Sequence, residues 1–432
     1  MERCVPDVCR VRRRLKLFFI GRSFLRIGIF ILSGMVLTIQ LAQAEMPMSL
    51  DDLLLRVDAN PSFQISESKV DEASFQLSVA QWARYPSLTY GMKNRREGIR
   101  ETTVTVEQPI WSGGAIVSGI KAANLDFISS QASALETRQQ VIRQIGSNYI
   151  SLRRVSEKLD QVRANIAELS KLEYTINKRV KGGVSPRSDR VTVQARISQA
   201  KSEEQQLIGE AGRLRENLTA LTGLSVGEVR KLQCLVPEGL SVDILERDAA
   251  QISPELARLR ANREANMALI SRARAELLPR LVVGVEHVKE EDTSFPRDDT
   301  TTYFAVRYSL GDGLSSLSKM NLARQEAETR SFEIKEAERN LREEMATLLV
   351  DYRATHSRLP SLTDLVSSNL RLIQSYLAQY KVGRRTWLDV VNAQREYNQS
   401  SIGLIEAQNS KCEAAFLLGV LSGKNFVSDS TL

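Results

Sequence analysis

The sequence predicts a mainly helical protein with a smaller β-sheet part, built from two structurally similar halves. The main evidence is an internal repeat at a spacing of 200 residues. "VEQPIWSGG" at 106–114 aligns with "VRYSLGDGL" at 306–314, "VKGGVSPRSDRVTVQ" at 180–194 with "YKVGRRTWLDVVNAQ" at 380–394, and "LTALTG" at 218–223 with "LGVLSG" at 418–423. Because one offset holds along most of each half, we interpret the chain as a tandem duplication. Long stretches in which apolar residues recur with a heptad period predict the helices, and short stretches in which they recur at every second residue predict the strands.

Each half predicts the same order of helices. A helix of moderate length comes first, at about 62–84 and 254–278, and a very long one follows two short segments, at about 113–181 and 314–382. A glycine-marked turn then leads into a second long helix, at about 187–222 and 387–421. The two shorter helices of a half together nearly match the long one in length. We therefore expect them to stack end to end beside it and to form a tall helical wall.

Apolar residues in the long helices recur at the spacing of a coiled coil. In the first half the series is Ile142, Ile145, Tyr149, Leu152, Val155, Leu159, Val162, Ile166, Leu169, Leu172, Ile176 and Val180. The second half has Leu341, Met345, Leu348, Tyr352, Leu359, Leu362, Leu370, Ile373, Leu377 and Tyr380. In the first series the steps average close to 3.5 residues, which is the heptad value. An ordinary antiparallel hairpin or a fibrous rod would show the same period, but a helix of this length spans about 100 Å, more than a globular domain needs.

Four short segments predict half-buried strands, because apolar and polar residues alternate in them. They are 88–93, 101–107, 281–286 and 304–309. Soluble hairpins show this pattern, but aromatic residues near the ends and an exported chain favour outer-membrane barrel strands. Four strands cannot close a barrel, and an open sheet in lipid leaves backbone groups without partners. Several chains would then share one barrel, with 8 strands from two copies or 12 from three.

The N-terminal segment predicts a cleaved secretory signal peptide over residues 1–44. A basic region precedes the apolar run 27–39, and Ala42-Gln43-Ala44 matches a cleavage site. A single membrane anchor is the alternative, but the run is shorter than the roughly 20 residues that a span requires. The segment also carries most of the formal net charge of +7. The remainder is close to neutral, which argues against a nucleic-acid partner.

Composition points away from catalysis. The chain has two histidines, His287 and His356, and we find no phosphate loop, nucleophile elbow or metal cluster. We therefore expect no enzyme activity, no metal and no cofactor. Outside the signal peptide, Cys234 and Cys412 could form a disulfide in an oxidising compartment or stay as unreactive thiols. No cysteine directly follows the cleavage point, so we do not expect a lipid anchor there.

Both glycine-marked turns have the signals of one helix ending and another beginning. Gly182 and Gly183 end the first long helix, and we expect Ser185 to cap the next one with Pro186 at its first position. In the second half Gly383 ends the helix. Thr386 and Asp389 fit a capping box, in which the carboxylate reaches back to the cap residue. By alignment of the repeats, Asp189 lies opposite Asp389.

These features together resemble the TolC family of outer-membrane channels over nearly all of the mature chain. The resemblance lies in "ANPSF" at 59–63, "ARYPSL" at 83–88, "QPIWSGG" at 108–114 and above all "YKVGRRTWLDVVNAQ". It implies a homotrimer with a 12-stranded β-barrel in the outer membrane of a Gram-negative bacterium and a periplasmic α-helical tunnel of coiled-coil helices. The domains would be two structural repeats, 45–223 and 253–423, an equatorial linker at 224–252 and a tail at 424–432. A periplasmic adaptor and an inner-membrane ABC exporter or proton-driven pump would be the partners.

The resemblance also gives roles to residues at the two turns. Asp389 would form an acidic ring at the periplasmic entrance, whereas Asn392 stands where the family has a second aspartate. A lock between hairpins would join Asp189 to Tyr380, and Ser188 or a neighbour to Arg385. Gly183, Val184, Gly383 and Arg384 would contact the adaptor. A solvated turn with a simple capping carboxylate is the structural alternative.

The function implied is a passive exit duct. The stretch "RRTWLDVVNAQRE" at 384–396 favours type I secretion of a protein such as a large adhesin. Efflux of drugs or other small molecules is the alternative within the same class. A non-channel periplasmic coiled-coil scaffold is the alternative from another class, and the alternating strands argue against it.

Overall fold

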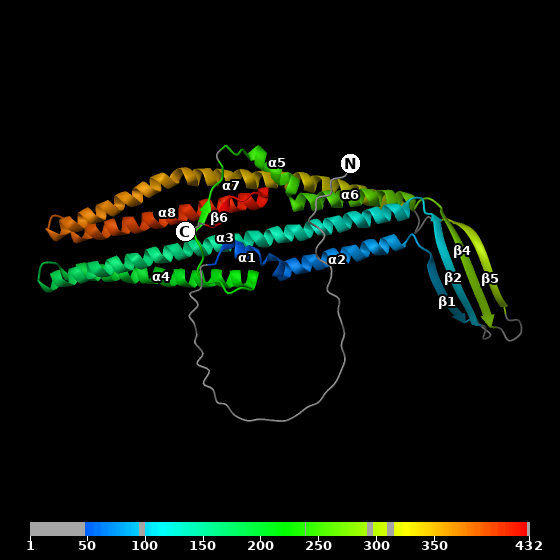
Figure 1. The fold of residues 1–432 in the computed structure, drawn as a ribbon, viewed down its shortest axis with the longest axis horizontal. Coiled ribbons are helices and arrows are strands. Elements are labelled where there is room, and N and C mark those ends of the chain that lie inside the picture. The colour runs from blue at the N-terminus through cyan, green and yellow to red at the C-terminus, as the bar shows by residue number, and fades with distance from the viewer. Residues whose placement is uncertain (1–47, 95–99, 238, 292–296, 309–314, 430–432) are drawn as a thin grey trace, which may run out of the picture. The chain divides into compact units, whose positions relative to one another are not determined.

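The computed structural model describes residues 48–94, 100–237, 239–291, 297–308 and 315–429, which lie in one compact unit from Glu45 to Leu432. The signal peptide predicted at residues 1–44 lies outside the described residues. The long and medium helices and the main sheet are described below (Figure 1). Among the helices of the described part, none is long and apolar enough to cross a bilayer.

The helices come in three pairs that have equal lengths in the two halves. They are α2 (Pro61–Trp82) and α6 (Pro254–Ala275) with 22 residues each, α3 (Ala115–Lys181) and α7 (Ser315–Lys381) with 67 each, and α4 (Arg187–Thr222) and α8 (Trp387–Ser422) with 36 each. The predicted bounds agree within three residues. The tandem duplication inferred from the sequence is therefore present in the structure.

The helices pack side by side into a wall. Helix α3 contacts α2 near the sheet and α4 toward the other end, so α2 and α4 follow one another along it (Figure 1). In the same way α6 and α8 both pack between α3 and α7. The order across the wall is therefore α2–α3–α6–α7 near the sheet and α4–α3–α8–α7 near the turns. The end-to-end stacking expected from the helix lengths is confirmed.

The sheet continues the wall at one end. Its four antiparallel strands run in the order β1 (Ser87–Asn94), β2 (Arg100–Trp111), β4 (Arg280–Glu291) and β5 (Arg297–Arg307). This order repeats the order of α2, α3, α6 and α7, which are the helices joined to these strands. All four strands that the sequence predicts are present, and three of them extend well beyond the predicted ends. Among the described residues, β1 and β5 are each paired on one side only.

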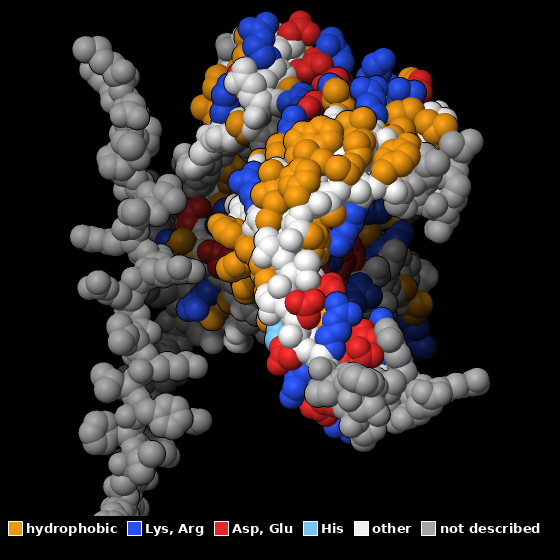
Figure 2. All heavy atoms as spheres, turned by 90° about the vertical axis from the view of Figure 1, so that its right-hand side faces the viewer, with side chains coloured by type: hydrophobic (Ala, Val, Ile, Leu, Met, Phe, Trp, Pro, Cys, Tyr) orange, Lys and Arg blue, Asp and Glu red, His pale blue; other side chains and the backbone are white. Residues whose placement is uncertain are grey.

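One face of the sheet is apolar and exposed, and the other is polar. The strand register places alternate residues in rows across the sheet, and the apolar face carries Leu88, Tyr90, Met92, Val104, Val106, Val283, Val285, Phe304 and Val306. Figure 2 shows a hydrophobic patch along this side of the molecule. Leu88 at 71% and Phe304 at 63% are far more exposed than apolar side chains of a soluble sheet would be. This face fits lipid, as outer-membrane strands require.

The largest apolar core lies around the middle of α3. Ile145, Tyr149, Leu152, Val155 and Val162 of the predicted heptad series are buried in it. In α7 the series is less completely buried: Met345 and Tyr352 are inside, whereas Leu370 is exposed. Helix α7 lies at the edge of the wall, where only the short helix α5 and its flanking loop pack on it besides α6 and α8 in the described part of the chain. The same heptad pattern is therefore only partly covered within a single chain.

A small additional layer covers this core. It comprises α1 (Leu50–Leu54), the short turn Val57–Ala59, β3 (Leu232–Cys234), α5 (Val242–Ile252) and β6 (Val427–Asp429). The region 224–252, predicted as a linker, thus contains a strand and a helix, and the predicted tail returns to pair its β6 with β3. A linker would require no such pairing; buried Leu232, Val236 and Phe426 hold the layer on the core.

A disulfide between Cys234 and Cys412 joins this layer to α8. The two cysteines are thus paired in the structure, which is one of the two states that the sequence allows. Beside the disulfide, the buried guanidinium of Arg153 donates to the Leu232 carbonyl at 3.2 Å and forms an ion pair with Glu157 at 3.0 Å. A buried cation requires such partners, so the pairing fixes β3 against α3 as well as α8.

Candidate functional site

The end of the wall opposite the sheet is formed by two turns with the same geometry. After α3, Gly183 has a φ of 73° and its amide donates to the Val180 carbonyl at 3.1 Å, while the Val184 amide donates to Arg179 O at 2.9 Å. After α7, Gly383 has a φ of 77°, and the Gly383 and Arg384 amides make the equivalent bonds to Tyr380 O and Gln379 O. This is the Schellman arrangement, in which glycine at positive φ closes a helix. Both predicted helix ends are confirmed.

The starts of the next helices differ. Thr386 caps α8: its hydroxyl accepts from the Asp389 amide at 3.3 Å, and the Asp389 carboxylate accepts from the Thr386 amide at 3.1 Å. The predicted capping box is therefore confirmed. The predicted Ser185 cap on α4 is wrong, because Pro186 has extended backbone angles and occupies the cap position itself, with no side-chain cap bond. Helix α4 therefore has Arg187 and not Pro186 as its first residue, in agreement with the predicted bound of about 187.

Asp389 has one carboxylate oxygen engaged and one without a partner. Both the Thr386 amide and the Thr386 hydroxyl, at 2.7 Å, donate to Oδ2, and the Arg385 guanidinium lies 4.0 Å from the same oxygen. Hydrogen bonds from the Thr386 hydroxyl, then from its amide, and the Arg385 charge hold the pKa of Asp389 below its usual range. Within the described chain Oδ1 has no hydrogen bond, so the cap leaves it available. Asn392, one turn further along, is exposed.

An apolar cluster below the turns joins the two hairpins. It contains Leu169, Leu172 and Ile176 of α3, Val193, Ile197 and Ala200 of α4, Tyr380 of α7, and Trp387, Val390 and Val391 of α8. Burying these side chains fixes the angle at which each turn leaves its helices. The turn crests themselves stay exposed, with Gly183, Val184, Gly383 and Arg384 all in solvent.

The structure of one chain does not contain the pairs predicted for the lock. Tyr380 is buried and its hydroxyl has no partner in the described chain. Arg385 lies over the ring of Tyr376, 4.5 Å from its centroid, within its own hairpin. Ser188 is exposed, and the Asp189 side chain makes no hydrogen bond or ion pair with the described residues. The predicted pairs therefore remain a prediction for contacts in an assembled channel.

A contact that the sequence analysis missed joins the hairpins instead. The Arg179 guanidinium of α3 lies 4.6 Å from the centroid of the Tyr380 ring on α7 and donates to the Tyr380 carbonyl at 3.4 Å. A cation over an aromatic face is stabilising, more so when it is shielded from water. The sequence offers little signal for it, because an arginine near a helix C-terminus is common without a partner.

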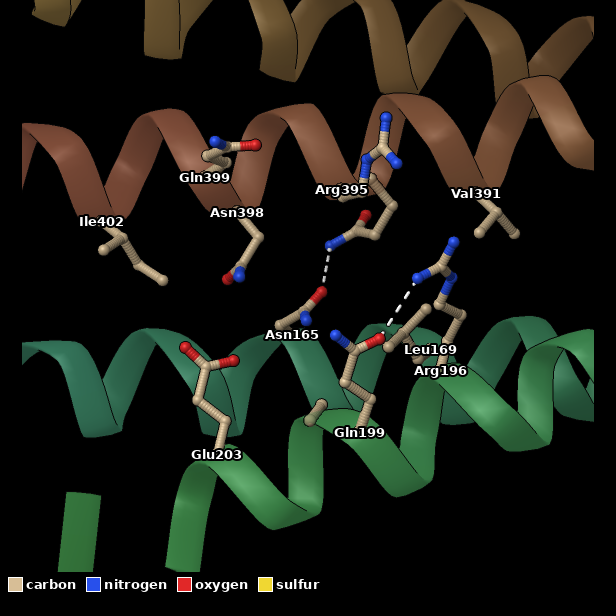
Figure 3. Close-up of a pocket in the computed structure, with 12 residues that line it drawn as sticks. Asn165, Leu169, Arg196, Gln199, Glu203, Val391, Arg395, Asn398, Gln399 and Ile402 are labelled. Atoms are coloured by element: carbon tan, nitrogen blue, oxygen red, sulfur yellow. Dashed lines mark hydrogen bonds between the residues drawn. The ribbon is translucent and has the colours of Figure 1, made fainter. Parts of the chain in front are cut away.

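Above the cluster, the seam between α3 and α8 is polar. Gln394 donates to Asn165 at 3.1 Å and Gln161 to Asn398 at 3.4 Å, and Lys158 pairs with Glu406 at 2.5 Å. A groove of about 240 Å³ opens beside these residues, with α4 on its other side (Figure 3). Arg196 and Glu203 of α4 and Arg395 and Gln399 of α8 line it. Asparagine and glutamine at helical spacing on both helices were the available signal for this seam.

Fold and site together define a class: a channel subunit with membrane-facing strands at one end and a paired-hairpin tip at the other. The outer membrane efflux protein family matches residues 55–224 and 245–423, which is most of the chain. The chain therefore belongs to this family and lies in the outer membrane of a Gram-negative bacterium as a transport channel rather than an enzyme. The resemblance to TolC-like channels is confirmed.

Solved structures show the same fold at low identity. The outer-membrane channel OprN has a TM-score of 0.78 and 16% identity, covering 87% of this chain and 90% of that one. The outer membrane protein VceC of Vibrio cholerae has 0.76 and 16%, covering 87% and 96%. The open state of the Neisseria gonorrhoeae MtrE channel has 0.72 and 16%, covering 89% and 91%. No curated protein matches the sequence significantly.

Proposed function

We propose that the protein is a passive outer-membrane exit duct, closed by three copies of the chain, for a tripartite system that exports a protein by type I secretion. Closure by several copies is supported by the edges of the chain. The sheet ends at β1 and β5, and the helical wall ends on the same two sides, at α2 and α7 near the sheet. In the part of the chain that the structure describes, strands β1 and β5 each lack one neighbour. An open sheet edge in lipid leaves unpaired backbone groups, each costing several kcal/mol.

The helical edges support the same conclusion. Apolar side chains on α2 and α4 at one edge and on α7 at the other are exposed: Phe75, Val79 and Val191 on one side, and Leu322, Phe332 and Val350 on the other. Pairing one edge with the opposite edge of the next chain would bury both sets and close the wall into a tube. The number three comes from the TolC resemblance, which gives a barrel of 12 strands from four per chain.

The periplasmic partners would meet the turns. Val184, Val382 and Leu388 are exposed apolar residues around the crests, and the four crest residues Gly183, Val184, Gly383 and Arg384 are the adaptor contacts that we propose. The adaptor would connect the duct to an inner-membrane ABC exporter or proton-driven pump. At the entrance, three copies of Asp389 would form one acidic ring. Asn392 leaves the neighbouring layer neutral, so cations should bind there more weakly than between two acidic rings.

The lock would combine weak contacts. Each exposed polar contact stabilises the closed tip by less than about 1 kcal/mol. In a trimer each contact occurs three times, so the total stabilisation is larger. The Arg179–Tyr380 contact is available within each chain, and Asp189, Ser188 and Arg385 are available for contacts across hairpins or chains. A closure of this strength suits a tip that a docked partner opens.

Two cargo classes fit the duct. The stretch "RRTWLDVVNAQRE" favours protein secretion by its resemblance to secretion-associated members. The efflux description of the matching family favours small molecules such as drugs. Deleting the gene separates them: loss of a large secreted protein with unchanged drug susceptibility supports secretion, whereas increased susceptibility with normal secretion supports efflux.

The duct itself is tested on purified protein. We expect outer-membrane extracts to yield trimers that resist heat in detergent and that produce single-channel conductance in planar bilayers. A soluble monomer without conductance would contradict the proposal and favour a periplasmic scaffold.

A further inference from the structure

The polar face of the sheet has a hollow where the strands join the helices. Its volume is about 850 Å³, and four charged side chains line it: Glu107, Glu276, Arg280 and Arg307. Trp82, Tyr85 and Tyr308 contribute aromatic walls. Because the opposite face of these strands is apolar, the polar face would point into the channel of the closed assembly. The hollow is thus a place where a solute in transit can meet fixed charges.

One charged pair in the hollow is held by a network that crosses three strands. Glu107 of β2, Gly284 of β4 and Tyr303 of β5 lie in one row. The Tyr303 hydroxyl donates to Glu107 Oε2 at 3.1 Å, and Arg307 Nη1 donates to Oε1 at 2.7 Å. Glycine in the middle strand is what lets the two side chains meet, since a Cβ at Gly284 would lie 2.5 Å from the Tyr303 ring. Both carboxylate oxygens of Glu107 are therefore engaged.

Next to this pair stands an arginine with no partner. Arg280 of β4 lies directly opposite Arg307 of β5 in the strand register. Like charges in that position destabilise a sheet. Glu107 neutralises Arg307, and Glu276 lies 3.6 Å from Arg272. In the described part of the chain Arg280 is exposed and makes no hydrogen bond or ion pair. Each chain therefore contributes one uncompensated cation to the hollow.

We propose that this hollow is an anion-binding site of the channel, at which Arg280 contacts phosphate or carboxylate groups of the passing solute. Arg307 lies beside Arg280 and is paired with Glu107. The inference rests on the proposed function, because closure of three chains turns Arg280 into a ring of three. Charges of one sign in a narrow passage with low-dielectric walls reinforce each other's field. The channel would then have opposite polarity at two levels, acidic at Asp389 and basic at Arg280.

Block by inorganic tripolyphosphate tests the site on purified trimers in planar bilayers, with the polyanion added on the side of the strand loops. Wild-type channels should be blocked, and Arg280→Gln should raise the half-blocking concentration about tenfold, as expected for losing a charged hydrogen bond. Glu107→Gln should lower it, because it frees the charge of Arg307. Arg297→Gln is the matched control: this arginine lies on the same face at the far strand end and is paired with Asp299 at 3.2 Å, so block should stay within twofold.

The outcomes separate the two proposals. Conducting wild-type channels that tripolyphosphate does not block overturn the anion site and leave the duct intact. Equal block of wild type and Arg280→Gln overturns it as well. If wild-type protein forms no channel, the proposed function fails first. If Arg280→Gln forms no channel, the opposite shift expected for Glu107→Gln decides, and an unchanged half-blocking concentration in that variant counts against the site.

Discussion

Gly146 of α3 offers the sharpest test of how the two halves pack. It faces Phe416 of α8, and a Cβ built at Gly146 would lie 2.0 Å from Phe416 Cε1 and 2.1 Å from Cζ. Phe416 belongs to the main core and is 6% exposed, so its ring can make room for a Cβ only if neighbouring core side chains also shift. Glycine at this position lets α3 and α8 approach closely in the region of the main core.

Helix propensity and packing predict opposite signs for Gly146→Ala. Propensity alone would stabilise the helix by about 1 kcal/mol. Overpacking a core costs about 1–3 kcal/mol, and the upper part of that range applies because a buried ring, and not a flexible chain end, must move. We therefore expect a net loss of about 1–2 kcal/mol, measured as a lower midpoint of thermal unfolding and of urea unfolding.

Two further variants make the reasoning specific. Phe416→Leu should recover part of the loss when combined with Gly146→Ala, which a double-mutant cycle detects as a coupling energy. Gly403→Ala on α8 is the matched control, because nothing lies within 4 Å of its Cβ position, and it should be neutral or stabilising. A Gly146→Ala protein as stable as wild type, or more stable, would refute the packing at this crossing.

Three other predictions concern the tip and the disulfide. Asp389→Ala should weaken block of the channel by divalent cations; because its pKa is lowered in the fold, block by the wild-type carboxylate should persist as pH falls through the usual aspartate range and disappear only below it, and unchanged block in the variant would remove Asp389 from the pore. The double variant Tyr380→Phe with Arg385→Ser should raise single-channel conductance, whereas a closed, low-conductance double variant counts against the lock; Tyr380→Phe keeps the ring that Arg179 covers, so Arg179→Gln tests that contact separately. Cys234→Ser with Cys412→Ser should lower the free energy of unfolding by up to about 5 kcal/mol, since the bond closes a loop with a sequence separation of 178 residues, and calorimetry that shows no change would deny it a stabilising role.

The helices were predictable because their signals are local. Gly183 and Gly383 mark the ends of α3 and α7, and the Thr386–Asp389 box marks the start of α8. The predicted Ser185 cap failed because a proline can stand at a cap position as well as at the first turn, and only the backbone angles of Pro186 decide between them. A heptad pattern also says which residues face a partner, but not whether that partner is in the same chain, as Leu370 shows.

The full length of the strands and the contacts at the tip could not be predicted from the sequence, because they depend on how distant segments pack together. Residues 289–291 and 297–302 are polar on both faces, so no alternation marks them, and backbone pairing with neighbouring strands extends β4 and β5 through them. Cys234 and Cys412 are distant in sequence, and the packing of β3 on α8 brings them together. The Arg179–Tyr380 contact likewise depends on how two hairpins pack, which residue types alone do not specify.

The central claim is that identical chains close one barrel through their open edges, and cross-linking of those edges in the outer membrane tests it most directly. Cysteine would replace Thr89 on β1 and, in separate variants, Thr301 or Ala305 on β5, all on the polar face of the edge strands. We expect oxidation to produce a ladder of one, two and three linked chains and nothing larger for at least one of these registers. Only single chains in every variant, or a ladder that continues past three, would contradict a closed trimer.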